Sequence, residues 1–156
     1  MGEVGRPHWP APRELVEACN RVTEFVADLA RELDCVVHIH AERGGIRTIE
    51  DMASRFKGVE RAVLHHAEGA YANDAAKRGL VPSIPAKEGE VKAALHCSSF
   101  VVESDFLDDP WRPGAVVAPW SIGRLFARLV RKGLIRIGEA QRILVENIAR
   151  LYGVES

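Results

Sequence analysis

Four side chains of this sequence combine imidazole and carboxylate groups at positions where one fold could gather them. They are Glu3, His40, His65 and Asp105. Imidazole and carboxylate together suit zinc, manganese and related ions, and two ions bridged by one carboxylate activate water while polarising a phosphoryl or carbonyl oxygen. Each residue alone has an ordinary explanation as a surface, strand-end or capping residue, but the four in order favour a metal site.

Three of these residues close short apolar runs, which are typical of strands. The runs are Cys35–His40, Ala62–His65 and Phe100–Asp105. Stretches with helical periodicity separate the runs, and this alternation predicts an α/β fold with a parallel sheet. The carboxyl ends of parallel strands gather at one edge of the sheet, so residues distant in sequence converge there.

The remaining elements follow from apolar periodicity and from glycine or proline at their ends. The clearest amphipathic helix spans about residues 12–33, and Thr48 with Asp51 is spaced as a capping pair for the next helix. We expect a single domain over residues 1–156, with helices also at about 49–56, 70–78, 90–96, 121–132 and 139–152, a strand at 80–84 and a loop at 108–114.

Two further histidines and one glutamate lie close to the predicted site. His38 shares a strand face with the strand-end histidine that follows it by two residues, and we interpret it as an interior residue beneath the site. His65 and His66 are adjacent and would point to opposite faces of a strand, so we expect only His65 to be a ligand. Glu103 either supports the site or lies in the interior.

Possible substrate contacts come from Arg6, His8, Ser83 and Arg112, which lie near strand ends where they could contact a phosphate. A role as solvated loop residues is equally compatible with each position. A basic run near the C-terminus is interpreted as a solvated helix face rather than a nucleic-acid groove, because acidic residues elsewhere balance it. This run comprises Arg124, Arg128, Arg131, Lys132 and Arg136.

Composition limits the classes of function. The formal net charge of −1 gives no field that would attract a polyanion, so extensive sequence-independent binding to duplex nucleic acid is not expected. The cysteines, Cys19, Cys35 and Cys97, are odd in number and widely spaced, which favours reduced thiols. No apolar run approaches the ~20 residues needed to cross a bilayer, and no leader pattern is present. We therefore expect a cytoplasmic protein without a membrane partner.

Ordered motifs along nearly the whole chain resemble those of the TatD family of metal-dependent hydrolases, particularly its archaeal branch. As an ordered set they are specific, whereas any single motif is weak. They are Gly2-Glu3-Val4-Gly5, Arg6-Pro7-His8, Val37-His38-Ile39-His40, Val63-Leu64-His65, Gly79-Leu80-Val81-Pro82-Ser83-Ile84, Glu103-Ser104-Asp105, Asp108-Asp109-Pro110, Arg112-Pro113-Gly114 and Glu146-Asn147.

The resemblance implies a TIM-like (β/α)8 barrel that hydrolyses phosphodiester bonds, commonly as a deoxyribonuclease. It further implies one or two divalent ions, zinc, manganese or magnesium, at the carboxyl ends of the strands. Glu3 then resembles the bridging carboxylate at the end of the fourth strand, and His40 and His65 resemble the two imidazoles of one metal site. Asp105 resembles the last-strand carboxylate that serves the other ion and orients water, which makes it the expected catalytic residue.

The sequence departs from the family pattern at its beginning. The family carries an HxH motif on its first strand, and no residues precede Met1 to supply it. A full barrel takes about 250 residues, so we expect a partial barrel that lacks about the first three strands. We expect such a chain to bind metal but to turn over slowly. Its open sheet edges predict self-association, most simply as a homodimer.

Two alternatives remain open. One is a non-catalytic metal-binding or scaffold protein. Metal binding that is retained without turnover would favour this alternative. The other is an amidohydrolase-type enzyme that acts on amide or ester bonds, because the same ligands suit either electrophile. Profiling phosphodiesters against amides and lactones discriminates the two enzymatic alternatives.

Overall fold

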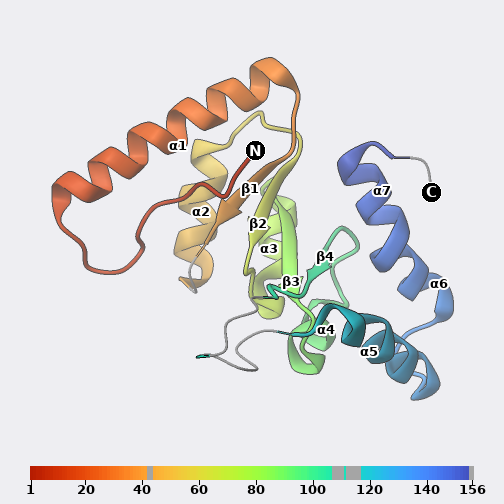
Figure 1. Ribbon diagram of the computed structural model, residues 1–156. Helices are drawn as coiled ribbons and strands as arrows, with labels where there is room; N and C mark the ends of the chain where they lie inside the picture. Colours follow the sequence, from red (N-terminus) through yellow and green to blue (C-terminus); the bar gives the residue numbers. More distant parts are fainter. Residues whose placement is uncertain (42–43, 107–110, 112–116, 155–156) are drawn as a thin grey trace.

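A parallel sheet forms the centre of the molecule. The computed structural model describes residues 1–41, 44–106, 111 and 117–154. Within them, strands lie in the order β1 (Val37–His40), β2 (Ala62–His65), β3 (Val81–Pro85) and β4 (Val101–Glu103), and each pairs in parallel with the next (Figure 1). Spatial order follows chain order, which is the arrangement of consecutive strands in an α/β barrel. The predicted parallel α/β fold is confirmed.

Helices connect the strands and close the chain. They are α1 (Arg13–Leu33), α2 (Gly45–Arg55), η1 (Gly69–Tyr71), α3 (Ala72–Lys77), α4 (Glu88–Ala94), α5 (Pro119–Arg131), α6 (Ile137–Gln141), the π-helical η2 (Arg142–Glu146) and α7 (Asn147–Tyr152). Each predicted helix has a counterpart, with ends displaced by a few residues. The predicted loop at 108–114 lies outside the described residues except for Trp111.

The predicted cap of the second helix is wrong. Thr48 is buried inside α2, which begins at Gly45 rather than near residue 49. The Gly44-Gly45 pair suggests a turn, but Gly45 adopts a φ of 56° and still starts the helix. The side chain of Asp51 is engaged elsewhere, as described below.

The N-terminal segment extends the sheet beyond β1. Val4 forms a parallel bridge with Ile39. The backbone N–H of His38 donates to the carbonyl of Met1 at 2.9 Å, and the N–H of Val4 donates to the carbonyl of His38 at 3.1 Å. His40 completes the ladder, with its N–H donating to the carbonyl of Val4 at 2.8 Å. Gly2 and Glu3, the two residues between Met1 and Val4, therefore lie beside β1.

Two glycines allow this close approach. A Cβ atom added at Gly5 would lie 2.3 Å from the carbonyl oxygen of His40, and one added at Gly2 would lie 2.6 Å from that of His38. Neither distance is tolerable for a carbon against a backbone oxygen, so only glycine fits. The Gly2-Glu3-Val4-Gly5 segment thus holds Glu3 against β1.

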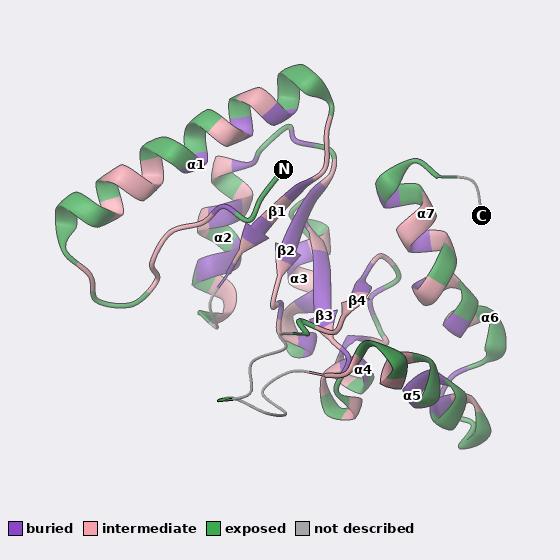
Figure 2. Cartoon of the chain, in the orientation of Figure 1, coloured by how far each residue is buried: buried purple, intermediate pink, exposed green. Residues whose placement is uncertain are grey.

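Different helices pack against the two faces of the sheet. Side chains such as Ile39, Leu64 and Ile84 point into the large core formed with the helices that connect the strands. The opposite face carries Val63 and Val101, which pack with residues of α7. Figure 2 shows the strands largely buried between these helices, while much of α1 and α5 faces solvent. No helix in the described part of the chain is long and apolar enough to cross a membrane.

Candidate metal centre

Three histidines converge at the carboxyl ends of β1 and β2. One ring nitrogen from each of His40, His65 and His66 lies within 4.8 Å of the other two. His40 and His65 are partners in the strand register, and their ring centroids are 6.1 Å apart. The His66 ring lies 5.1 Å from that of His40 and 3.9 Å from that of His65. Parallel pairing therefore brings together residues that are 25 positions apart in the sequence.

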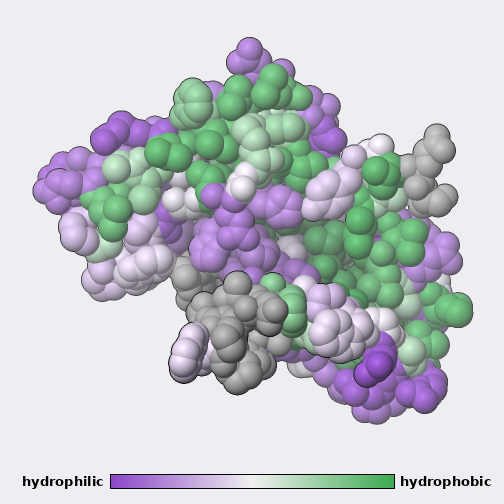
Figure 3. All heavy atoms as spheres, in the orientation of Figure 1, coloured by the Kyte–Doolittle hydropathy of each residue, from purple (hydrophilic) through white to green (hydrophobic). Residues whose placement is uncertain are grey.

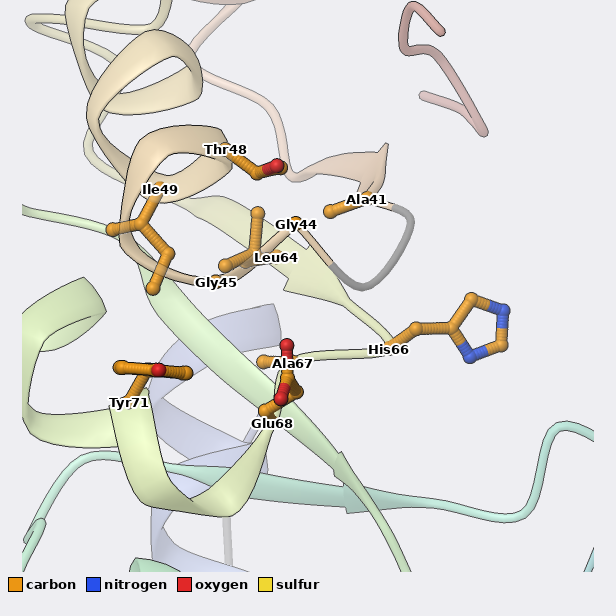
Figure 4. Close-up of a pocket in the computed structure, with 10 residues that line it drawn as sticks. All are labelled: Ala41, Gly44, Gly45, Thr48, Ile49, Leu64, His66, Ala67, Glu68 and Tyr71. Carbon is orange, nitrogen blue, oxygen red and sulfur yellow. The ribbon is translucent and has the colours of Figure 1, made fainter. Parts of the chain in front are cut away.

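The expectation that His65 and His66 point to opposite faces is wrong. His66 follows the last residue of β2 and adopts a left-handed φ of 59°, so the alternation of an extended strand no longer applies. Figure 4 shows the His66 ring pointing away from the apolar side chains of Leu64 and Tyr71. The adjacent histidines thus serve the same site, and no local pattern in the sequence signals this turn.

Glu3 joins two of the histidines. Its Oε2 accepts a hydrogen bond from His40 Nδ1 at 2.9 Å, and its Oε1 lies 2.7 Å from His65 Nδ1. Burial raises the pKa of Glu3, but the His40 hydrogen bond and the neighbouring imidazoles outweigh burial and lower it overall. Glu3 is therefore ionised at neutral pH. The structure brings Glu3, His40 and His65 together as the sequence predicted.

The arrangement suits a divalent cation. His65 Nδ1 is buried and makes no hydrogen bond within the described residues, because its short contact with Glu3 lacks hydrogen-bond geometry. A nitrogen lone pair and a carboxylate oxygen held this close are the donors that zinc and manganese prefer. Glu103 and Asp105 add two further carboxylates around the imidazoles. This excess of negative groups would be balanced by a bound cation.

Glu103 supports the two adjacent histidines. Its side chain is only 9% exposed, and its Oε1 lies 3.0 Å from His66 Nδ1 and accepts the backbone N–H of His66 at 3.2 Å. Its Oε2 accepts the Ser83 hydroxyl at 2.5 Å and lies 3.1 Å from His65 Nε2. The hydrogen bond with Glu103 raises the pKa of His66 although burial opposes the rise. Carboxylates in contact with ligand histidines fix ring orientation and increase basicity.

Asp105 lies at the rim of the cluster. It follows β4 by two residues and has a left-handed φ of 47°, so the predicted strand ends earlier than expected, at Glu103. Its Oδ1 is 4.0 Å from His65 Nε2 and its Oδ2 is 3.7 Å from His66 Nε2. The side chain is 44% exposed, and both distances are longer than a direct hydrogen bond.

The predicted substrate contacts occupy other places. Arg6 Nε donates to Asp51 Oδ2 at 2.5 Å, and His8 Nε2 lies 3.1 Å from the same oxygen. Both side chains therefore tie the N-terminal segment to α2. Ser83 hydrogen-bonds within the cluster, as described above, and Arg112 lies outside the described residues.

His38 lies below the histidine cluster, on the face of the sheet covered by α7. Its Nε2 is 2.8 Å from the hydroxyl of Tyr152, and burial lowers the pKa of His38. A cavity of about 260 Å³ extends from His38 past His65 and Glu103 toward Ile148. The interior position predicted for His38 agrees with this geometry.

A second hollow lies on the opposite side of β2. It is lined by Leu64, Thr48 and Tyr71 among others and has a volume of about 20 Å³ (Figure 4). This volume is close to that needed for one water molecule. It is too small for a nucleotide.

Comparisons with known proteins agree with this geometry. The TatD-related DNase family matches residues 1–153. The chain is 33% identical over 162 aligned positions to the uncharacterized protein MJ1127 of Methanocaldococcus jannaschii, which covers 99% of this chain and 56% of that protein. Its fold is similar to the crystal structure of YjjV, a TatD homologue from Escherichia coli, with a TM-score of 0.71 and 21% identity.

The match to YjjV covers 99% of this chain and 63% of that chain. This chain therefore spans less than two thirds of the length of either relative, and its sheet corresponds to part of the TatD TIM barrel. The family match covers 153 positions, nearly the whole chain. The protein belongs to the TatD-related DNase family.

Proposed function

We propose that this protein is a metal-dependent hydrolase that cleaves phosphodiester bonds in DNA. The observation that carries the proposal is the convergence of Glu3, His40, His65 and His66 at the carboxyl ends of neighbouring parallel strands. Family membership supports DNA as the substrate class.

The residues divide into ligands, a supporting group and a proton acceptor. Glu3, His40, His65 and His66 would hold a divalent ion, which supplies a Lewis acid that activates water and stabilises charge developing on the phosphoryl group. Glu103 orients the two adjacent imidazoles. Asp105 is half-exposed beside them and takes the proton of the attacking water as a general base.

The test separates binding from turnover. Metal content and affinity for Zn²⁺ and Mn²⁺ are measured with hydrolysis of a single-stranded oligonucleotide, for the parent chain, His65→Ala and Asp105→Asn. We expect His65→Ala to lose both metal and activity, and Asp105→Asn to keep metal while losing activity. His96→Ala is the matched control, because His96 is exposed and precedes β4 at the opposite end of the sheet. Full activity of Asp105→Asn would exclude the role given to Asp105.

The same assay distinguishes the alternatives. Tight metal binding without hydrolysis of any substrate would identify a non-catalytic metal-binding protein. Hydrolysis of amides or lactones, with phosphodiesters left intact, would identify an amidohydrolase-type enzyme. Because the chain spans 56% of MJ1127, a chimera carrying the remaining MJ1127 segment is the appropriate comparison. We expect the chimera to turn over DNA faster than this chain alone.

We also propose that the chain forms a homodimer through α1. Leu15, Val22, Phe25 and Leu33 are between 49% and 66% exposed, and Figure 3 shows apolar side chains along this helix. Leu15 and Val22 are seven residues apart and Phe25 follows three later, which is the spacing of a helix–helix seam. Phe25→Glu should convert a dimer to a monomer in light scattering, while Glu24→Gln should not. A monomeric parent chain at high concentration would exclude the dimer.

A further inference from the structure

Two aromatic side chains contact each other at the surface beside the histidine cluster. The ring centroids of Phe106 and Trp120 are 5.8 Å apart, with an angle of 58° between the ring planes. Phe106 is 47% exposed and Trp120 is 65% exposed. Large aromatic rings left this open are characteristic of ligand-binding surfaces, because burying them on binding is strongly favourable.

This aromatic pair is attached to the candidate centre by the backbone. Phe106 directly follows Asp105, so their Cα atoms are separated by about 3.8 Å. Asp105 in turn faces His65 and His66. Trp120 is the second residue of α5 and reaches back to Phe106. A group resting on these rings would therefore lie next to the bond that the centre acts on.

A basic surface continues from Trp120 along α5. Arg124 and Arg128 follow Trp120 at four-residue steps, and Arg131 follows three later, so all share one side of the helix. The three arginines are exposed. Arg124 and Arg131 form no ion pair within the described part of the chain.

Cations outnumber carboxylates around Glu88, next to this face of α5. Arg128, Lys132 and Lys92 share the single carboxylate of Glu88, at distances of 2.9, 3.4 and 2.7 Å. Glu88 is half-buried, and the Lys92 hydrogen bond with the surrounding cations lowers its pKa to about 2. Three cations against one carboxylate leave net positive charge beside Arg124 and Arg131. The surface suits a chain of phosphates.

We propose that Phe106 and Trp120 form a stacking platform for a nucleobase adjacent to the scissile phosphate, and that the basic face of α5 follows the neighbouring phosphates. The proposal rests on the proposed function, because it assigns the substrate position to the same centre. Sequence alone favoured a solvated helix face for the basic run. The structure changes this interpretation because it places an exposed tryptophan on that face and against Phe106.

The platform predicts a preference for unpaired bases. In a duplex the faces of each base are covered by its neighbours, whereas a single strand or frayed end leaves them free to stack on an aromatic ring. Stacking is tolerant of base identity because every base has a flat face. The platform therefore selects strandedness rather than sequence.

The test measures binding of two labelled oligonucleotides of equal length and charge to the intact chain by fluorescence anisotropy. One is oligothymidylate, and the other carries abasic sites throughout. Trp120→Ala should raise the Kd for oligothymidylate about tenfold, as expected for loss of one stacked base, and change the Kd for the abasic strand less than twofold. Trp120→Phe should restore most of the difference in Kd between oligothymidylate and the abasic strand. This result separates loss of stacking from a folding defect. Trp9→Ala, which removes another exposed tryptophan, should change neither value.

The arginines should behave differently. Arg124→Ala should weaken binding of both oligonucleotides equally and reduce the slope of log Kd against log salt by about 0.7. Equal losses for both strands in Trp120→Ala, or no loss in either, would overturn the platform even if hydrolysis persists. Base-selective binding without any hydrolysis would instead retain the platform and overturn the proposed catalytic function.

Discussion

The hydroxyl of Ser83 donates a 2.5 Å hydrogen bond to Oε2 of Glu103, across the paired strands β3 and β4. This bond fixes a carboxylate that is almost fully buried and that contacts both His65 and His66. The orientation of two candidate ligands is therefore determined by residues on the two strands that follow them. We therefore expect metal binding at this candidate site to depend on side chains that need not touch the ion.

Glu103→Gln should weaken metal binding about 10- to 100-fold, because the amide keeps the shape of the side chain but loses the charge that orients the imidazoles. Isothermal titration with Zn²⁺ measures the change. Glu60→Gln is the control, since Glu60 is exposed and precedes β2 at the opposite end of the sheet. Unchanged affinity in Glu103→Gln would remove Glu103 from the supporting role.

Gly5→Ala should disrupt the candidate metal centre, although Gly5 is not one of the candidate ligands. The added Cβ would lie 2.3 Å from the carbonyl oxygen of His40, so the N-terminal segment must move away from β1 and take Glu3 with it. We expect a loss of roughly 1–3 kcal/mol in the free energy of unfolding together with weaker metal binding. Gly123→Ala is the control, because nothing lies near its added Cβ within α5 and the substitution should be neutral or slightly stabilising.

The strand ends that form the site could be predicted from the sequence. Short apolar runs that close on His40 and His65 indicate parallel strands, and parallel pairing alone then brings these two residues side by side. The two-residue alternation of a strand also placed His38 correctly on the interior face. These conclusions needed only local periodicity and the rule that parallel strands share an edge.

The contributions of His66 and Glu103 could not be predicted in the same way. A positive φ at His66 turns its side chain into the cluster. Such a φ is uncommon for a non-glycine residue, and no neighbouring residue in the sequence predicts it. The role of Glu103 depends on the register of β3 and β4, which brings it to Ser83 and to both adjacent histidines. Arg6 and His8 pair with Asp51 through a tertiary contact, which the sequence does not show. From the sequence alone, both side chains were therefore available to contact a phosphate.

Asn147→Ala should destabilise the junction between the C-terminal helices and the sheet. Asn147 Nδ2 donates to the carbonyls of Ser98 at 3.0 Å and Phe100 at 2.8 Å, next to the start of β4. Removal leaves the buried carbonyl of Phe100 and the part-buried carbonyl of Ser98 without these donors, so we expect a loss of about 2 kcal/mol in the free energy of unfolding. Urea denaturation measures it. Asn20→Ala on the half-buried side of α1 is the matched comparison, and an equal loss there would show that the two bonds contribute nothing specific.

Asp51 should make the stability of the chain depend on acidic pH. Burial raises the pKa of Asp51, but hydrogen bonds from Arg6 and His8, with the charge of Arg55, outweigh burial and hold it below its usual value of 3.8. A pKa that is lower in the folded state stabilises the fold above the unfolded value, and this contribution is lost as pH falls through the folded value. Asp51→Asn should therefore lower the free energy of unfolding at pH 7.

The destabilisation by Asp51→Asn should shrink as the pH falls below about 4 and disappear once the carboxyl is protonated in both states. Asp28→Asn is the matched control, because the side chain of Asp28 is 78% exposed and its contact with Arg31 is screened by water. Urea unfolding of both variants and the parent chain between pH 2.5 and pH 7 measures how the free energy of unfolding changes with pH. The pH values should lie on both sides of about 3.9, the pKa of an unperturbed aspartate. A destabilisation by Asp51→Asn that stays constant over this range would show that packing, and not the charge of Asp51, links the N-terminal segment to α2.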